Sequence, residues 1–223
     1  MLLYCFRGIV GEDLTPELMV RLGGIAARHF RNEGYHEISV AGDYRIHTAS
    51  LKHALMGGLA GAGMSVTDLG VLCSGAIAAW CKHNAHPGCM VTASHNPPDW
   101  NGVQFMEPDS HIWWPALENA AKAALDQPYE WPAWDRCGAI NRRDDVLDQY
   151  IEWVAAMANP RGSLKVVLDP GGGAGIPAAQ RLLERIGMEV VVINGTPDGM
   201  FDGRPSEPRP EYLGELQETF VAE

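Results

Sequence analysis

Residues 88–105 read GCMVTASHNPPDWNGVQF, and the order of residue types in this stretch predicts a strand, a stiff loop and a returning strand. The apolar start indicates a strand that ends in small residues just before Ser94. The pair Pro97-Pro98 then fixes the backbone φ angles and removes two amide donors, so the loop cannot relax into a helix. Because apolar residues return at 103–105, we expect the chain to pair back beside the first strand.

Ser94 on this loop has the setting that a nucleophile needs. Its support is rigid, it lies at the end of a strand, and His95 places an imidazole beside it in sequence. The alternative interpretation is a proline-rich turn that the serine hydroxyl merely caps. The stretch therefore marks either a reactive hydroxyl or a turn.

The bulk composition is that of an ordinary globular protein. Of 223 residues, 46% are hydrophobic and 20% are charged, which supplies a core and allows one large domain or two smaller ones. The formal net charge of −11 disfavours nonspecific binding to nucleic acid or to an anionic membrane, because both require a basic surface. The apolar stretches are shorter than a membrane span. With five cysteines and no CxxC pair, we expect a reducing, cytoplasmic compartment.

Helical and strand periods alternate along the chain, which indicates an α/β protein with helices layered around a largely parallel sheet. The predicted helices cover residues 16–32, 51–59, 76–82, 115–126, 144–157, 176–186 and 211–221. The predicted strands cover residues 36–41, 64–69, 88–93, 103–105, 164–168 and 189–193. Thr15 is the expected N-cap of the first helix, and Ser50 is that of the second.

Residues 127–141 are rich in proline and tryptophan and have no clear period, so we interpret them as a loop between two domains. The first domain, residues 1–140, is predicted to be a three-layer α/β/α sandwich with a mostly parallel mixed sheet. The second, residues 141–223, contains one strand–helix–strand unit and is expected to be an incomplete α/β domain. The last helix reaches Glu223 without a stop signal, so we expect a truncated chain or a half-protein that relies on another chain.

The string Thr92-Ala93-Ser94-His95-Asn96-Pro97 resembles the phosphoserine loop of the α-D-phosphohexomutases, the family of phosphoglucomutases and phosphomannomutases. Pro98 and the pair Asn101-Gly102 follow in step. Four further motifs resemble family motifs in the same order: an arginine-glycine pair, a strand-end arginine loop, an Asp-Leu-Gly strand end and a glycine turn. In this chain they are Arg7-Gly8, Gly42-Asp43-Tyr44-Arg45 with Ser50 behind it, Asp68-Leu69-Gly70, and Asp169-Pro170-Gly171 through Gly175.

The resemblance implies a phosphohexomutase that interconverts hexose 1-phosphate and hexose 6-phosphate through a phosphoserine at Ser94 and a bisphosphate intermediate. It implies Ser94 and His95 as catalytic residues, Ser94 as a ligand of Mg²⁺, and a hexose 1,6-bisphosphate as activator. The substrate-binding residues that it implies are Arg7, Arg45, Asn101 and Gln104. The other magnesium ligands and the sugar-recognition loop would lie in C-terminal domains supplied in cis or in trans, so this chain alone is expected to be inactive.

Three places depart from the family pattern. Leu3-Tyr4-Cys5-Phe6 stands where Gly-Thr usually precedes the arginine-glycine pair, and Cys73-Ser74-Gly75 stands where Thr-Pro is usual. Gln104 occupies the position of a lysine that serves the active site. Glutamine hydrogen-bonds a sugar hydroxyl, but it carries no charge and shuttles no proton. A noncatalytic phosphosugar-binding or regulatory relative is therefore the alternative function.

Two other motifs point to different chemistry. The turn at 173–178 fits the dinucleotide fingerprint of an oxidoreductase, but Asn194 follows the next strand where an acidic residue is needed. A tight strand-to-helix turn is the plainer interpretation. The second motif is a possible zinc site, because cysteine and histidine are the usual zinc ligands. It consists of Cys81, His83, His86 and Cys89, whose spacing is not a common zinc pattern. Four tryptophans near the interdomain loop are expected to pack or to form an interface: Trp113, Trp114, Trp131 and Trp134.

Overall fold

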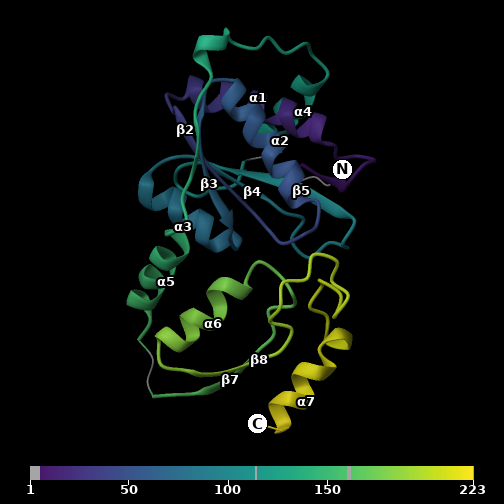
Figure 1. Cartoon of the computed structure of the whole chain (residues 1–223), viewed down its shortest axis with the longest axis vertical. Helices are drawn as coiled ribbons and strands as arrows, with labels where there is room; N and C mark the ends of the chain where they lie inside the picture. The colour runs from purple at the N-terminus through teal and green to yellow at the C-terminus, as the bar shows by residue number, and fades with distance from the viewer. Residues whose placement is uncertain (1–5, 114, 160–161, 223) are drawn as a thin grey trace.

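The computed structural model of the chain describes residues 6–113, 115–159 and 162–222, and Figure 1 shows them as two α/β units, one above the other. The N-terminal unit is built on a six-stranded sheet with strand order β1-β5-β4-β2-β3-β6. Its strands are β1 (Phe6–Ile9), β2 (Glu37–Gly42), β3 (Ser65–Val71), β4 (Gly88–Val91), β5 (Trp100–Met106) and β6 (Ile140–Arg142). β5 is antiparallel to both of its neighbours, β1 and β4, and the other pairings are parallel, so the sheet is mixed and mostly parallel, as predicted.

Helices cover both faces of this sheet (Figure 1). They are α1 (Pro16–Asn32), α2 (Thr48–Gly61), α3 (Ser74–Asn84), α4 (Pro115–Leu125) and α5 (Val146–Met157). On one face, α1, α2 and α4 share a core with the sheet in which Phe6, Phe30 and Phe105 are fully buried. On the other face, α3 and α5 pack over Met90 and Met106. The predicted three-layer α/β/α sandwich is therefore confirmed.

The starts of the first two helices follow different rules. Thr15 Oγ1 accepts a hydrogen bond from the Leu18 amide (3.2 Å), as expected for the N-cap of α1. The prediction that Ser50 caps α2 is wrong, because this helix already begins at Thr48 and the Ser50 hydroxyl donates to the His47 carbonyl (2.9 Å). The hydroxyl of Thr48 bonds to the Asp43 carboxylate, so the strand-end loop before α2 fixes where the helix starts.

The segment between the two units is only partly the loop that its composition predicts. It holds a short 3₁₀ helix, η1 (Trp134–Arg136), and the strand β6, which pairs in parallel with β3. All three residues of β6 are exposed, so this edge strand lacks the alternation of apolar and polar residues that would reveal it. The predicted domain boundary, between residues 140 and 141, falls inside β6.

Asp68, at the end of β3, ties α2 and β6 to the sheet. Its carboxylate accepts hydrogen bonds from Lys52 Nζ (2.7 Å) and the Gly70 amide (2.8 Å), and Arg142 Nη1 lies 3.2 Å away. Burial by itself raises the pKa of Asp68, but these hydrogen bonds and the charges of Lys52 and Arg142 outweigh it and hold the pKa below its usual value. The Asp-Leu-Gly motif therefore serves here as a structural tie.

The second unit follows α5. It contains β7 (Lys165–Leu168), α6 (Ile176–Arg185), β8 (Glu189–Val192), the 3₁₀ helix η2 (Pro210–Tyr212) and α7 (Gly214–Ala222). β7 and β8 pair in parallel, with α6 as the crossover between them. The strand–helix–strand unit expected from the sequence is confirmed, and the segment from Gly195 to Arg209 leads back toward the first unit (Figure 1).

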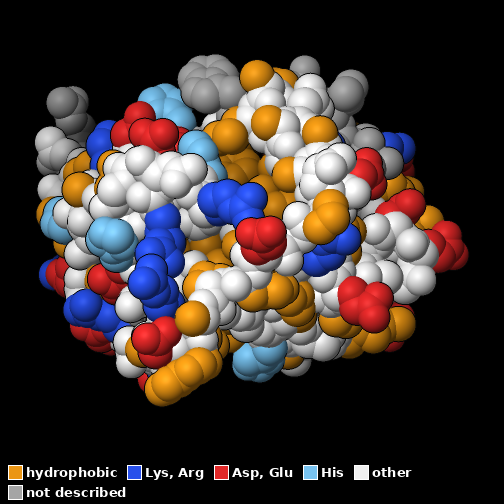
Figure 2. Space-filling model, turned by 90° about the horizontal axis from the view of Figure 1, so that it is seen from above, with side chains coloured by type: hydrophobic (Ala, Val, Ile, Leu, Met, Phe, Trp, Pro, Cys, Tyr) orange, Lys and Arg blue, Asp and Glu red, His pale blue; other side chains and the backbone are white. Residues whose placement is uncertain are grey.

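Figure 2 shows the end of the first unit that faces away from the second, and basic, acidic and apolar side chains are interspersed there. Of the four tryptophans, Trp113 is buried against Phe105, whereas Trp134 is 90% exposed and does not pack. Trp131 is partly exposed and contacts Tyr129, and Trp114 lies outside the described residues. Among the described helices, none combines the length and the apolar character needed to cross a bilayer.

The contact between α1 and α2 depends on glycine at position 58. A Cβ built there would overlap the backbone carbonyl of Val20 in α1, and Gly58 is buried. The neighbouring Gly57 is exposed in the same helix, and no described atom beyond its own helix backbone and neighbours lies within 4 Å of where its Cβ would be. The two positions therefore separate the effect of helix packing from that of helix propensity.

We expect Gly58→Ala to lower the free energy of unfolding by about 2 kcal/mol, because the helices must move apart. Gly57→Ala should raise it by about 0.5–1 kcal/mol, because alanine loses less backbone entropy in a helix. Urea denaturation of both variants measures the difference. Equal changes in the two variants would contradict the close approach of α1 and α2.

Candidate active site

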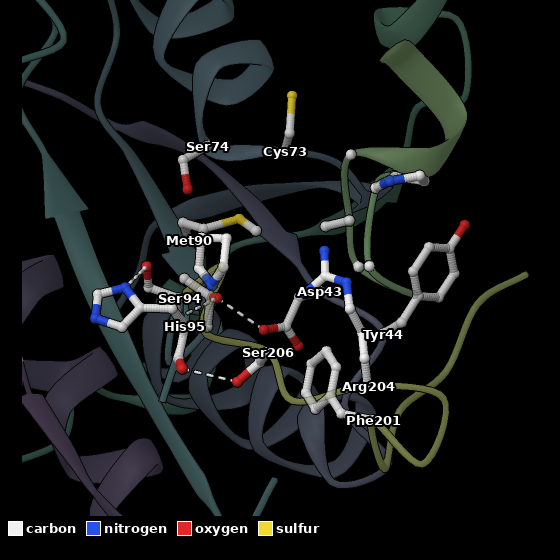
Figure 3. A pocket seen from close by; sticks show the side chains of 17 residues that line it. Asp43, Tyr44, Cys73, Ser74, Met90, Ser94, His95, Phe201, Arg204 and Ser206 are labelled. Carbon is white, nitrogen blue, oxygen red and sulfur yellow. Dashed lines mark hydrogen bonds between the residues drawn. The ribbon is translucent and has the colours of Figure 1, made fainter. Parts of the chain in front are cut away.

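Ser94 lies at the carboxyl end of β4 in a strained backbone conformation. Its φ angle is +58°, in the left-handed region that residues with a Cβ rarely adopt. The amide of Ser94 donates to Thr92 Oγ1 (2.9 Å), and the amide of Asn96 donates to the Ala93 carbonyl (3.1 Å). This tight turn leaves the serine exposed, and its side chain lines a cavity (Figure 3).

Arg45 supports the serine loop from beneath. Its guanidinium donates to four backbone carbonyls of the loop, those of Ser94 (3.1 Å), Asn96 (2.6 Å), Pro97 (2.5 Å) and Trp100 (3.2 Å). The side chain of Arg45 is 0% exposed. Since Pro97 and Pro98 remove amide donors from the loop, a side chain has to supply the donors that these carbonyls need.

Asp43 holds Arg45 and the start of the loop together. Its carboxylate lies 3.4 Å from Arg45 Nε and accepts hydrogen bonds from the hydroxyls of Thr92 (2.7 Å) and Thr48 (2.5 Å). Burial lowers the pKa of the Arg45 guanidinium, and the Asp43 charge opposes that shift. Sequence reasoning singled out Arg45 in the Gly42–Arg45 motif and missed Asp43, although the aspartate is two residues away.

Asn101 is also a structural residue of the loop. It is fully buried, its Nδ2 donates to Thr48 Oγ1 (2.8 Å) and lies 2.9 Å from His47 Nδ1, and its Oδ1 accepts from the Gly102 amide (2.7 Å). Like Arg45, it has no side-chain surface that a ligand could reach in this structure. In this structure the polar atoms of both side chains bond to the loop and its surroundings, and the direct binding of substrate by Arg45 and Asn101 stays a prediction.

Arg7 and Gln104 lie on the neighbouring strands. Arg7 in β1 pairs with Gly102 in β5, and a Cβ at Gly102 would come within 2.5 Å of Arg7 Cγ, so the glycine makes room for the arginine stem. Arg7 Nε is buried and has no hydrogen-bond partner in the structure. Gln104 is half-buried and pairs with Met90, which lines the cavity. Neither residue lines the cavity itself, and their roles in substrate binding stay predictions.

His95 lies at the mouth of the cavity, next to the serine hydroxyl. Its Nδ1 is 3.2 Å from Ser94 Oγ, within hydrogen-bonding distance, and its side chain is 54% exposed. The structure thus brings together the two side chains that were predicted to be catalytic (Figure 3). A hydroxyl beside an imidazole nitrogen is an arrangement suited to proton transfer during nucleophilic attack.

The second unit supplies the opposite wall of the cavity, which encloses ≈ 410 Å³. The glycine turn after β7 and the segment from Phe201 to Pro208 line this wall (Figure 3). Arg204 brings a positive charge to it and is held by Asp169, with Nε and Nη2 donating to the carboxylate over 2.8 and 3.1 Å. From the sequence, the segment from Phe201 to Pro208 is predicted only as a loop. It has neither helical nor strand periodicity, so the pattern of residue types does not reveal that it lines a cavity.

Two contacts fasten this wall to the serine loop. The hydroxyl of Ser206 lies within hydrogen-bonding distance of the carbonyls of His95 (2.7 Å) and Asn96 (2.8 Å). The Arg45 guanidinium lies over the ring of Phe201 in a cation–π contact, with Cζ 4.8 Å from the ring centroid. The cavity is therefore a joint product of the two units.

The other candidate sites are not assembled. Cys81 and Cys89 are buried, and the described residues include no group of three or more His, Cys, Asp or Glu side chains that could hold a metal ion. The possible zinc set therefore fails on geometry. The turn at 173–178 is indeed a tight connection from β7 to α6, and it lines the cavity beside Ser94.

If Arg45 holds the loop, a lysine in its place should not hold it, because one ammonium group cannot donate to all four carbonyls that the planar guanidinium reaches. We expect Arg45→Lys to lower the free energy of unfolding by about 2 kcal/mol and to speed hydrogen–deuterium exchange in residues 94–101. Arg28→Lys is the control, since Arg28 is exposed in α1. Unchanged exchange in Arg45→Lys would contradict the supporting role.

Comparison with known proteins finds matches along nearly the whole chain. The family model described as phosphoglucomutase/phosphomannomutase, alpha/beta/alpha domain I, matches residues 4–128, and the model for domain II of the same family matches residues 148–223. A probable phosphoglucosamine mutase of Methanopyrus kandleri is 34% identical over 218 residues, which cover 97% of this chain and 48% of that protein. A phosphoglucomutase/phosphomannomutase of Thermococcus kodakarensis is 32% identical over 228 residues, 97% of this chain and 49% of that protein.

Solved structures give the same result. A phosphoglucomutase/phosphomannomutase family protein from Burkholderia thailandensis superposes with a TM-score of 0.86 at 28% identity, over 99% of this chain and 49% of that one. A putative phosphomannomutase from Thermus thermophilus gives 0.84 at 28% identity, over 98% and 51%. The chain thus spans about half the length of the curated relatives it matches. It belongs to the phosphoglucomutase/phosphomannomutase family.

Proposed function

We propose that this chain provides the phosphoryl-carrying half of a phosphohexomutase, with Ser94 as the residue that accepts and donates the phosphoryl group. The observation that carries the proposal is the placement of Ser94: an exposed hydroxyl on a braced turn, 3.2 Å from an imidazole nitrogen and lining a cavity. A phosphoryl carrier has to meet large substrates in the same position each time, so a rigid support and an open cavity both matter.

The proposed step transfers a phosphoryl group from a hexose 1,6-bisphosphate to the serine. The Ser94 hydroxyl gives up its proton to His95 Nδ1 as its oxygen bonds to phosphorus. The bond between phosphorus and the sugar oxygen breaks with its electron pair left on that oxygen, which then gains a proton. In the reverse direction, phosphoserine donates its phosphoryl group to the 6-hydroxyl of a hexose 1-phosphate or to the 1-hydroxyl of a hexose 6-phosphate. Reorientation of the bisphosphate between the two transfers interconverts hexose 1-phosphate and hexose 6-phosphate.

Arg204 gives the cavity one cationic side chain, which is a candidate ligand for the phosphoryl group although the chain as a whole is acidic. Phosphoryl transfer depends on alignment and on stabilising negative charge on the phosphoryl oxygens. Arg204 lines the cavity, and its bidentate pairing with Asp169 fixes the direction of the guanidinium. Arg7 lies on the strand next to the serine loop's return strand and remains the second candidate for a phosphate ligand.

Magnesium would supply further charge stabilisation, with phosphorylated Ser94 as one ligand. The described residues do not complete such a site, because no cluster of three or more His, Cys, Asp or Glu side chains is present among them. The remaining ligands would have to come from C-terminal domains, in cis or in trans, which would also carry the sugar-recognition loop. On this proposal residues 1–223 are inactive without those domains, and the protein acts in the cytoplasm.

The names of the relatives bear on the substrate. Several are named probable phosphoglucosamine mutases, and one is named phosphoglucomutase/phosphomannomutase. We therefore propose glucosamine, glucose and mannose phosphates as the substrates to assay first. The alternative function is that of a noncatalytic relative, and the residue that favours it is Gln104, which replaces the usual lysine. The assay below distinguishes the two functions.

We expect the full polypeptide that carries this chain to gain one phosphoryl group on Ser94 after incubation with a hexose 1,6-bisphosphate, and to turn over at least one of the three hexose phosphates. Ser94→Ala should abolish both, because the neighbouring hydroxyl of Thr92 is already engaged by the Asp43 carboxylate and the amide of residue 94. Mass spectrometry of the peptide containing Ser94 and a coupled mutase assay measure the two outcomes.

Ser163→Ala is the matched control, because that hydroxyl donates to the Gly187 carbonyl in the second unit, away from the cavity. It should keep phosphorylation and activity. Binding of hexose phosphates with neither phosphoserine nor turnover would instead establish the noncatalytic role. Phosphorylation of Ser94→Ala to the same extent as the wild type would contradict the proposal.

A further inference from the structure

Glu207 in the second unit faces the imidazole that contacts Ser94. Its Oε2 lies 3.6 Å from His95 Nε2, while the opposite ring nitrogen, Nδ1, lies 3.2 Å from Ser94 Oγ. A hydroxyl, an imidazole and a carboxylate therefore lie one after another between the two units, with the carboxylate at ion-pair rather than hydrogen-bond distance from the ring. Position 207 is part of the segment that shows no helical or strand period in the sequence.

A carboxylate at this position selects the protonation pattern of a neutral His95. If the proton is on Nε2, the N–H points toward the Glu207 charge, and Nδ1 has a free lone pair that accepts the Ser94 proton. If the proton is on Nδ1, the Nε2 lone pair faces the carboxylate, which is repulsive, and the imidazole becomes a donor to the serine oxygen. The charge of Glu207 thus favours the tautomer that can activate the hydroxyl.

Ser206 keeps the carboxylate in register with the imidazole. Its hydroxyl lies 2.7 Å from the His95 carbonyl and 2.8 Å from the Asn96 carbonyl, so residue 206 is fastened to the backbone of the serine loop itself. Glu207 is the next residue along. Movement of the second unit relative to the serine loop would break this contact and withdraw the carboxylate together with it.

We infer that Glu207 is a positioning residue for phosphoryl transfer to Ser94, acting through the tautomer of His95 and supplied by the second unit only when Ser206 engages the serine loop. The inference rests on the proposed function of Ser94. Glu207 faces Nε2, the ring nitrogen of His95 that is remote from the serine. Its effect is therefore on the proton that leaves Ser94 Oγ for His95 Nδ1 as the oxygen–phosphorus bond forms.

The size of the effect follows from exposure. The side chains of His95 and Glu207 are 54% and 39% exposed, so solvent screens their interaction. We expect Glu207→Gln to slow single-turnover phosphorylation of Ser94 by a hexose 1,6-bisphosphate about fivefold, with little change in the affinity for the bisphosphate. Ser206→Ala should slow it in the same direction, because the carboxylate is then less well placed.

The decisive readout is the tautomer of His95, measured by ¹⁵N NMR on the full polypeptide with labelled histidine, with the signal assigned by its loss in His95→Ala. In the wild type the Nε2–H form should predominate. In Glu207→Gln the Nδ1–H fraction should rise, because an amide donates as readily as it accepts. Glu211→Gln is the control, since it removes a nearby negative charge from η2, where Glu211 is exposed.

These measurements test the positioning role of Glu207 separately from the proposed phosphoryl transfer to Ser94. A shifted tautomer together with slower phosphorylation in Glu207→Gln, and neither in Glu211→Gln, supports the positioning role. An unchanged tautomer or an unchanged rate in Glu207→Gln overturns it, even if Ser94 is phosphorylated normally. A wild type that never acquires phosphoserine refutes the proposed function, and the inference then fails with it.

Discussion

The site depends on one buried cation that donates to four carbonyls. A loop with two prolines and a serine at φ +58° has few amides to bond its own carbonyls, and its backbone is strained. The Arg45 guanidinium supplies the missing donors, and Asp43 holds that cation while also bonding Thr92 and Thr48. The same carboxylate thus joins the end of β2, the start of α2 and the end of β4. The hydrogen bonds from Arg45 and Thr92 hold the loop in the conformation that places Ser94 in the left-handed region.

This arrangement also explains why two units are needed. The sheet of the first unit places the serine at its carboxyl edge, which is where open α/β sheets bind ligands. On that edge alone, the hydroxyl would face solvent. The second unit closes the space with its glycine turn and with the segment that carries Arg204 and Ser206. Because Ser206 contacts the carbonyls of the serine loop, the geometry around Ser94 is coupled to the position of the second unit.

Much of the fold could be predicted from the sequence, because periodic burial leaves a periodic pattern. The helix from Pro16 and the buried strand before Ser94 are clear examples. The sequence does not predict β6, because its three residues are all exposed. It predicts the wrong N-cap for α2, because a serine in the first turn of a helix is hard to distinguish from an N-cap serine. In the candidate site, the loop motif predicts Ser94 and His95 as a pair, and the structure places their side chains next to each other. The motif also singles out Arg45, but a sequence does not show whether an arginine is buried in hydrogen bonds to a loop, as here, or reaches a ligand. Ser206 and Glu207 had no signal, because their contacts span more than a hundred residues.

The central claim is that a rigidly held Ser94 carries a phosphoryl group at an open cavity. Phosphorus-31 NMR tests it most directly, on protein incubated with a hexose 1,6-bisphosphate and freed of excess ligand. We predict one protein-bound phosphoserine resonance, assigned to Ser94, with a line as broad as the tumbling of the whole molecule requires. The absence of a bound resonance, or a narrow line from a phosphate that moves independently of the protein, would contradict it.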